Sequence, residues 1–266
     1  MRIAFFDSGF GGLSVLDAAR RQQPSHQYLY YADSAHAPYG AKPAAQVRDL
    51  VFAACDFIAA QQPDALVVAC NTATAVCIEA LRARYAFPVI GMEPAVKPAL
   101  HQQQNKRVLV LATSLTLQES KLSELLQRVD THRRTDMLAM DALVSFAEQG
   151  QFDGTQVHAY LHDKLAHYQV NTYGAVVLGC THFIYFAPLL RRVFAPTTSF
   201  VHGNAGTVRH LFSQLNIESS VHEPSSAEPF TALSQPHVQL SNIEFYRSGV
   251  ATPVAALMPY FDQLAQ

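Results

Sequence analysis

The chain has 266 residues, of which 49 % are hydrophobic, enough for a sizeable core in one large domain or two smaller ones. Its formal net charge of −2, without a basic run, argues against a nucleic-acid partner. The N-terminal apolar stretch is too short for a signal peptide, and no apolar run approaches the length of a membrane span. We therefore expect no membrane segment. The four cysteines show no disulfide-framework pattern, which fits reduced thiols in a cytoplasm, and they include no CxxC pair, so we expect no structural zinc site.

Short apolar runs alternate with helical patterns in the first part of the chain. The predicted strands are Arg2–Phe6, Tyr28–Tyr31, Ala65–Ala69 and Val89–Ile90. The predicted helices are Leu13–Gln22, Ala44–Ala60 and Ala73–Tyr85. This alternation predicts an α/β fold with a doubly wound parallel sheet.

The alternation restarts after Pro94 and Pro98, which mark a crossing point between two halves. The predicted strands of the second half are Arg107–Leu111, Met137–Met140, Ala175–Leu178 and Ser199–Val201. The predicted helices are Leu117–Val129, Ala142–Glu148, Thr155–His167, Tyr185–Val193 and Gly206–Leu215. We therefore expect two similar α/β domains.

The tail has a different composition. Glu218–Pro236 is rich in Ser, Pro and Glu and is predicted to be a loop, Val238–Tyr246 an antiparallel strand, and Pro253–Leu264 a closing helix. We expect the tail to return to the first half, giving domains 1–97 plus 209–266 and 98–208. Ligands of such sheets bind beyond the carboxyl ends of the strands, and both Cys70 and Cys180 occupy that position.

Two cysteines occupy two copies of one local setting. Cys70 and Cys180 each follow a short buried-strand pattern and a small residue, and each precedes residues suited to open a helix. A helix N-terminus stabilises a thiolate, and two facing thiols suit a reaction that needs one base on each side of a carbon. The alternative is inert packing, the usual state of a buried Cys, and it fits Cys55 and Cys77 within helical patterns.

Turns that contain Gly or Pro follow the first two predicted strands. The run from Asp7 to Gly12 can present backbone N–H groups to an anion, although it fits neither a dinucleotide fingerprint nor a P-loop. A tight turn capped by Asp7 or Ser8 is the alternative interpretation. The Pro38-Tyr39-Gly40 turn belongs to the same edge of the sheet.

Histidines offer two further candidates. His182 lies two residues after Cys180 and could help hold a thiolate, or could face solvent at a helix start. His158 and His162, with His167 beyond, have a spacing that can hold a metal on a helix face. No acidic partner stands between them and no third ligand is evident, so we predict no metal site and interpret them as a solvated helix face.

In combination these segments resemble bacterial glutamate racemase, a member of the aspartate/glutamate racemase superfamily. The matching segments are Phe6–Leu16, Pro38–Gly40, Val68–Ala73, Pro88–Gly91 with Glu93-Pro94, and Leu178–Phe183. They occur in the family's order over most of the first two hundred residues. Singly they are weak, but together they are highly specific, and the first motif favours glutamate over aspartate.

The resemblance implies two α/β domains with the active site between them. It also implies a cofactor-independent isomerase, a cytoplasmic homodimer, that supplies D-glutamate for peptidoglycan synthesis and thereby for cell wall biogenesis and cell shape. It makes Cys70 the base for D-glutamate and Cys180 the base for L-glutamate. Asp7 would support Cys70, and His182 with Glu148 would support Cys180; nothing local distinguishes Glu148. The residues implied to line the substrate pocket are Asp7, Ser8, Tyr39, Gly40, Asn71, Thr72, Thr181 and His182.

Three segments depart from the family pattern. They are Met140-Asp141 in place of Cys-Pro, His202-Gly203-Asn204 in place of Asp-Ser-Gly, and Asp33-Ser34-Ala35-His36 in place of Asp-Thr-Ala-Arg. None removes a candidate base.

Two other function classes stay open at this point. One is a hydrolase with Cys180 as nucleophile and His182 as base, which leaves Cys70 without a role. The other is a binding homologue that has lost activity, against which the retention of Cys70, Cys180, Asp7, Glu148 and His182 argues.

Overall fold

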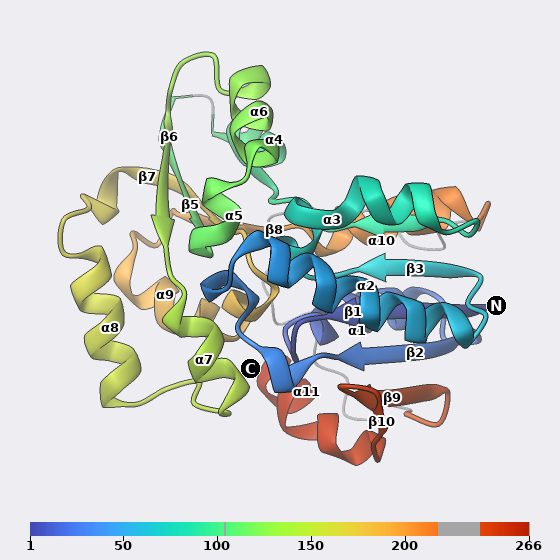
Figure 1. Cartoon of the computed structure of the whole chain (residues 1–266). Helices are drawn as coiled ribbons and strands as arrows, with labels where there is room; N and C mark the ends of the chain where they lie inside the picture. Colours follow the sequence, from blue (N-terminus) through green and yellow to red (C-terminus); the bar gives the residue numbers. More distant parts are fainter. Residues whose placement is uncertain (104, 218–239, 266) are drawn as a thin grey trace.

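A computed structural model describes residues 1–103, 105–217 and 240–265, and shows two sheets flanked by helices (Figure 1). The first half consists of β1 Arg2–Asp7, α1 Leu13–Gln22, β2 Gln27–Ala32, α2 Ala44–Ala60, β3 Ala65–Val68, α3 Asn71–Arg84 and β4 Val89–Gly91. Two 3₁₀ turns, η1 Ser34–His36 and η2 Tyr39–Ala41, link β2 to α2. The predicted bounds of α1 and α2 are confirmed.

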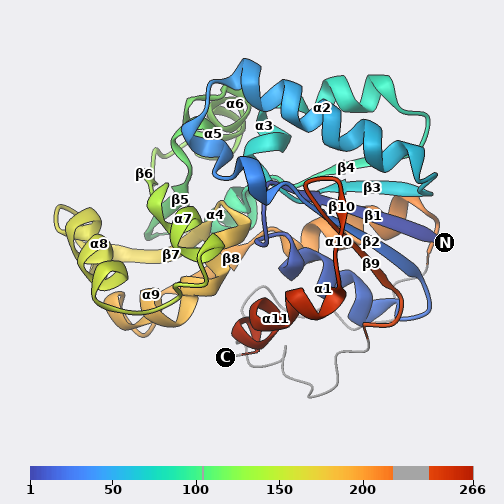
Figure 2. The same ribbon diagram turned by 60° about the horizontal axis from the view of Figure 1, so that its bottom comes forward.

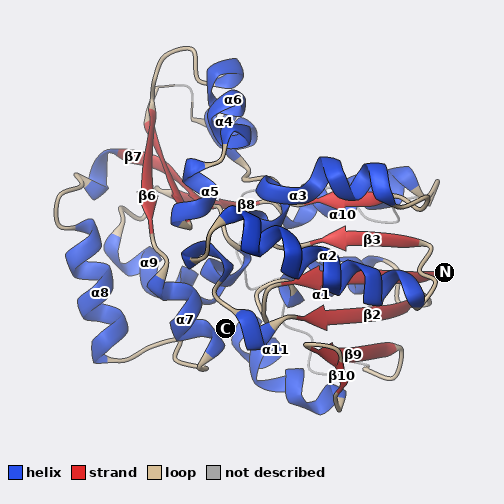
Figure 3. Cartoon of the chain, viewed as in Figure 1, coloured by secondary structure: helices blue, strands red, loops and turns tan. Residues whose placement is uncertain are grey.

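The second half carries the smaller sheet (Figure 3). Its elements are α4 Val96–Gln102, β5 Arg107–Ala112, α5 Ser114–Gln118, α6 Ser120–Val129, β6 Thr135–Ala139, α7 Ala142–Glu148, α8 Thr155–Leu165, η3 Val170–Thr172, β7 Tyr173–Leu178, η4 Thr181–Phe186, α9 Ala187–Val193 and β8 Ser199–His202. The chain then continues through α10 Asn204–Gln214, β9 Ile243–Arg247, β10 Val250–Ala251, η6 Val254–Leu257 and α11 Met258–Leu264.

The two sheets repeat one topology. The six-stranded sheet has the order β10-β9-β2-β1-β3-β4, and the four-stranded sheet has the order β6-β5-β7-β8. The first four strands of each half have the same parallel arrangement. In the first sheet β1 lies between β2 and β3, with β4 beyond β3, and in the second sheet β5 lies between β6 and β7, with β8 beyond β7. The predicted α/β class with parallel sheets is confirmed.

Alternating strand residues explain why both faces of the first sheet are covered. Phe6, Leu29 and Val68 pack under α2 and α3, whereas Phe5 and Val67 pack under α1 and α10. Figure 2 shows α2 and α3 on one side of this sheet and α1 and α11 on the other. Strands buried on both faces read as continuous apolar runs, which is the pattern that the sequence shows.

One core cluster is shared by both sheets. It includes Phe5 and Val67 of the first sheet, Leu109 and Val176 of the second, and Phe212 of α10. A separate cluster packs α4 and α6 on the other face of the second sheet. The two halves are therefore fixed to each other by shared packing.

Three elements differ from the predictions. Helix α4 was not predicted because it contains Pro98, but this proline lies in the first helical turn, where no intrahelical N–H bond is lost. The predicted helix Leu117–Val129 is two helices, because Glu119 adopts an extended conformation. The predicted helix Tyr185–Val193 begins as the 3₁₀ segment η4.

The tail returns to the first sheet with a different strand direction from the one expected. β9 pairs with β2 in parallel, so the antiparallel prediction for Val238–Tyr246 is wrong for its described part. The short β10 is antiparallel to β9. The predicted loop Glu218–Pro236 lies outside the described residues. The closing helix is present as η6 and α11.

The domain boundaries 1–97 plus 209–266 and 98–208 stay a prediction. Helix α10 begins at Asn204, before the proposed boundary, and packs against α1 and β4 of the first half. Within the described ranges, no helix has both the length and the hydropathy that crossing a membrane requires.

Candidate active site

The candidate residues gather where the strand order of each sheet reverses. Asp7 ends β1, and Cys70 lies two residues beyond β3; these two strands are neighbours. Thr113 directly follows β5 and Cys180 lies two residues beyond β7, which are neighbours in the second sheet. Such positions at the carboxyl ends of parallel strands are where α/β folds bind ligands.

Cys70 serves as the N-cap of α3. Its Sγ accepts a hydrogen bond from Ala73 N at 3.4 Å and lies 3.5 Å from Ser8 Oγ. The side chain is only 5 % exposed. Burial raises the pKa of the Cys70 thiol well above its ordinary value, and the neighbouring Asp7 carboxylate raises it further.

The Asp7 carboxylate is fully buried and has several donors. It accepts from Ser8 N at 2.9 Å and Gly12 N at 2.6 Å, within its own turn. It also accepts from Thr181 Oγ1 at 3.2 Å, which belongs to the second half. Burial raises the pKa of Asp7, although the bonds from Gly12 and Ser8 oppose that shift. Asp7 therefore connects the turn after β1 with the segment that carries Cys180.

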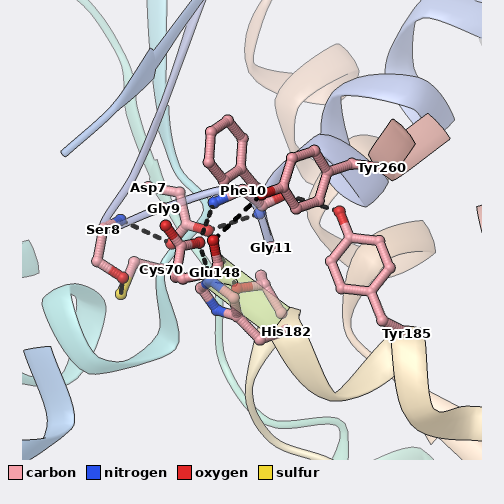
Figure 4. Close-up of polar contacts among 12 residues, drawn as sticks. Asp7, Ser8, Gly9, Phe10, Gly11, Cys70, Glu148, His182, Tyr185 and Tyr260 are labelled. Carbon is pink, nitrogen blue, oxygen red and sulfur yellow. Dashed lines mark hydrogen bonds and ion pairs between the residues drawn. The ribbon is translucent and has the colours of Figure 1, made fainter. Parts of the chain in front are cut away.

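Cys180 lies in a different setting. It precedes the 3₁₀ segment η4 and makes no side-chain cap hydrogen bond. Its Sγ lies 3.8 Å from His182 Nδ1. His182 Nε2 in turn lies 2.8 Å from Glu148 Oε1 (Figure 4). Burial alone would lower the pKa of His182, but hydrogen bonds to Cys180 and Glu148 and the charge of Asp7 outweigh it and hold that pKa well above its ordinary value. An imidazolium beside a sulfur stabilises the thiolate.

Glycines let the loop after β1 approach the Cys180 side closely. A Cβ on Gly9 would lie 2.0 Å from Glu148 Oε1, and a Cβ on Gly11 would lie 2.5 Å from Thr181 Oγ1. Phe10 N donates to Glu148 Oε1 at 2.7 Å. A side chain at position 9 would displace the Glu148 carboxylate, and one at position 11 would meet Thr181 and the His182 backbone, so the glycine run permits contact between the halves.

Three threonine hydroxyls meet on the Cys70 side. Thr72 Oγ1 lies 2.9 Å from Thr113 Oγ1 and 3.2 Å from Thr116 Oγ1. Thr113 and Thr116 were not predicted as site residues. The position of Thr113 directly after β5, as the N-cap of α5, is the sequence signal that could have identified it.

The remaining pocket candidates differ in how they face the site. Tyr39 is 1 % exposed, and its hydroxyl donates to Asp33 at 2.6 Å, so it stabilises its own turn. A Cβ on Gly40 would lie 2.5 Å from Thr113 Cβ, which places this turn against the second half. Asn71 Nδ2 donates to Met92 O, while its buried Oδ1 has no partner among the described residues.

Two of the three departures from the family pattern contact candidate residues, since Asp33 bonds Tyr39 and Asp141 lies against Gly40. Asp141 accepts from both Ser114 N and Ser114 Oγ, so it caps α5 beside Thr113. Asn204 N donates to His202 Nδ1 at 3.4 Å. Asp33 contacts His36 Nδ1 at 2.9 Å, within the segment that leads to Tyr39.

The other cysteines and histidines lie away from this constellation. Cys55 and Cys77 are buried with α2 and α3 in the core of the first half. His158 is exposed and lies 2.6 Å from Asp153. In the described part of the chain, no group of three or more His, Cys, Asp or Glu side chains has the arrangement of a metal site.

Comparison with known proteins identifies relatives. Residues 14–211 match the family model described as Asp/Glu/Hydantoin racemase. The glutamate racemase of Halothermothrix orenii is 47 % identical over 79 % of this chain and 83 % of that protein.

Solved structures are also similar. The glutamate racemase of Campylobacter jejuni has a TM-score of 0.77 and 29 % identity, covering 98 % of this chain and 97 % of that one. Escherichia coli glutamate racemase, solved with L-glutamate and the activator UDP-MurNAc-Ala, has a TM-score of 0.75 and 33 % identity, covering 84 % of this chain and 85 % of that one. The chain belongs to the Asp/Glu/Hydantoin racemase family and is an enzyme of the glutamate racemase type.

Proposed function

We propose that the protein interconverts L- and D-glutamate by a two-base mechanism, with Cys180 and Cys70 on opposite faces of the α-carbon. The observation that supports this most is the convergence of two thiols from equivalent positions in two sheets. Their surroundings are unlike, with an ion pair beside one and a buried carboxylate beside the other. Glutamate as substrate comes from the relatives, and the two thiols supply the chemistry.

For the L-isomer, the Cys180 thiolate removes the α-proton. The His182 imidazolium, held by Glu148, stabilises that thiolate before the reaction. The Cys70 thiol, whose raised pKa keeps it protonated at neutral pH, then delivers its proton to the opposite face. The D-isomer reacts by the reverse sequence, with the Cys70 thiolate as base and the Cys180 thiol as acid.

Polar groups around the two thiols would bind the substrate. The hydroxyls of Ser8, Thr72 and Thr181 and the threonines Thr113 and Thr116 can donate to carboxylates. The buried Asn71 Oδ1, an acceptor without a partner among the described residues, suits the substrate ammonium group. Preorganised donors of this kind also stabilise the charge of the carbanion.

Family membership supports the wider assignment. We propose a cofactor-independent, cytoplasmic homodimer that supplies D-glutamate for peptidoglycan synthesis. Activity should survive exhaustive dialysis against a chelator, and light scattering at micromolar concentration should give twice the mass of the chain. Restoration of lost activity by a metal or pyridoxal phosphate, or a stable monomer mass, would contradict these two proposals.

The alternatives fit the geometry less well. A Cys180–His182 hydrolase would leave the Cys70 cluster without a role, and an inactive binding homologue would not need the buried His182–Glu148 pair. Incubation with L-glutamate in heavy water separates the three functions. We expect deuterium at the α-position while optical rotation decays; retention of protium, with rotation unchanged, would contradict racemisation.

A further inference from the structure

The peptide group between Gly9 and Phe10 is bonded at both ends. Its carbonyl oxygen accepts a hydrogen bond from the Tyr30 hydroxyl at 2.7 Å, and its N–H donates to Glu148 Oε1 at 2.7 Å. In a trans peptide the C=O and the N–H point in opposite directions. Tyr30 and Glu148 therefore hold this one peptide plane from opposite sides (Figure 4 shows the Glu148 side).

The loop needs such restraint because of its composition. Gly9, Gly11 and Gly12 flank Phe10, and glycine gives the backbone wide conformational freedom. Close packing requires these glycines, so side chains cannot stiffen the loop from within. Tyr30 is fully buried on β2, an interior strand of the six-stranded sheet, and its hydroxyl reaches the loop from that strand.

The bonds continue from this peptide to one thiol. Glu148 Oε1, which receives the Phe10 N–H, also lies 2.8 Å from His182 Nε2, and His182 Nδ1 lies 3.8 Å from Cys180 Sγ. A chain of polar groups thus runs from Tyr30 through one peptide, one carboxylate and one imidazole to Cys180. Hydrogen bonds in such a chain polarise one another in a buried setting.

We propose that Tyr30 is a positioning residue for the Cys180 face of the reaction, acting through the Gly9–Phe10 peptide on Glu148 and His182. It does not touch the reacting atoms. Because it fixes the N–H that holds Glu148 Oε1, it sets how firmly the carboxylate orients the imidazole. This role rests on the proposed two-base function and goes beyond it by assigning a residue remote from the substrate to one enantiomer.

The test uses the two enantiomers of threo-3-chloroglutamate, which differ in configuration at the α-carbon and report on each face separately. A thiolate takes the α-proton, and the electron pair of that C–H bond forms a C=C bond as chloride leaves the β-carbon. The resulting enamine hydrolyses to 2-oxoglutarate and ammonium. Chloride release with one enantiomer depends on Cys180 and with the other on Cys70, and Cys180→Ser identifies which is which.

We expect Tyr30→Phe to slow elimination from the Cys180-dependent enantiomer about tenfold more than from the other. Tyr28→Phe is the matched control: it lies on the same strand and face, it is equally buried, and its hydroxyl donates to Gln23 O at 2.7 Å, away from the site. Tyr28→Phe should leave the ratio of the elimination rates of the two enantiomers unchanged. Equal slowing of both enantiomers by Tyr30→Phe, or no change, would overturn the inference.

Two further variants separate positioning from general loosening of the loop. Tyr185→Phe removes a hydroxyl that donates to the next carbonyl, Phe10 O, at 2.8 Å. If it changes the ratio as much as Tyr30→Phe does, the specific role of Tyr30 is wrong. If Tyr30→Phe does not fold, 3-fluorotyrosine at position 30 keeps the ring and strengthens the hydroxyl as a donor. It should raise the elimination rate of the Cys180-dependent enantiomer relative to that of the other enantiomer. An unchanged ratio of these two rates would contradict the proposal.

Failure of this inference is distinguishable from failure of the proposed function. If Cys70→Ser and Cys180→Ser lose elimination from the same enantiomer, the two-base function is wrong and this inference is wrong with it. If the two serine variants lose opposite enantiomers while Tyr30→Phe leaves the ratio unchanged, only the role of Tyr30 is wrong.

Discussion

The surroundings of Cys70 and Cys180 are alike in sequence and unlike in structure. Both cysteines follow a buried parallel strand and a small residue. Cys70 caps an α-helix and lies near Ser8 and Asp7, whereas Cys180 precedes a 3₁₀ segment and lies beside the His182–Glu148 ion pair. A repeated strand–Cys motif has thus produced two thiols with different partners, a buried carboxylate near one and a histidine–glutamate pair beside the other.

The largest expected effect comes from removing either thiol. Cys70→Ser and Cys180→Ser should each lower kcat for racemisation by about 10²–10⁴-fold, because a hydroxyl is much less acidic than a thiol. The measurement is the decay of optical rotation from L-glutamate.

Cys77→Ser is the control for the cysteine variants. Cys77 is 1 % exposed and lies on α3 beyond the site, so its variant should keep the wild-type rate. Racemisation at the wild-type rate by either Cys70→Ser or Cys180→Ser would show that racemisation does not need both thiols.

A smaller effect should follow from a substitution that places an extra methyl group against His182, beside Cys180. In Gly11→Ala the new Cβ would lie 2.5 Å from Thr181 Oγ1 and 2.6 Å from both the backbone N and Nδ1 of His182, so the segment that carries the imidazole must move. Misplacing a catalytic group by about 1 Å costs about 10²-fold in kcat/KM. Steady-state kinetics should show this loss.

Gly206→Ala serves as the matched substitution. Gly206 lies within α10, and a Cβ there meets nothing within 4 Å in the described structure. It should keep full activity and gain about 1 kcal/mol of stability. Equal activity of the two alanine variants would contradict the close contact between the loop and His182.

The smallest effect concerns stability against pH. The pKa of His182 is raised in the folded protein above its ordinary value of 6.5, so protonated His182 stabilises the fold. This contribution is complete below about pH 6.5 and is lost as pH rises through the folded pKa, by at most about 1.4 kcal/mol per pH unit. Chemical denaturation of wild type and His182→Gln should show a difference in unfolding free energy that shrinks in this direction.

The exposed His162 provides the reference for the pH measurement. His162→Gln removes an imidazole from the outer face of α8 and corrects for effects unrelated to the Glu148 pair. A His182→Gln difference that grows with rising pH would mean that the imidazolium is not favoured in the fold.

Local sequence patterns predicted most of the helices and strands, and they predicted that Cys70 and Cys180 each follow the carboxyl end of a strand. Apolar periodicity sets helix bounds such as Leu13–Gln22, and the strand–Cys pattern places each thiol at a sheet edge. The direction of β9 could not be predicted, because alternation does not reveal which neighbour a strand will pair with.

Contacts between distant segments were the part that the sequence could not provide. Glu148 looks like an ordinary helix end, and only the fold brings it to Phe10 N and His182. Tyr30 looks like a core residue of a strand until its hydroxyl is seen to bond Gly9 O. The Thr72–Thr113–Thr116 cluster likewise joins residues from both halves.

The central claim is that the two thiols act on opposite faces of one carbon. Because L- and D-glutamate have equal free energies in solution, kcat/KM for racemisation is the same in both directions for any variant, and racemisation alone cannot assign the faces. The most direct measurement is chloride release from each enantiomer of threo-3-chloroglutamate by Cys70→Ser and Cys180→Ser. We expect Cys70→Ser to process only the L-enantiomer and Cys180→Ser only the D-enantiomer; the same preference in both variants would contradict the two-base account.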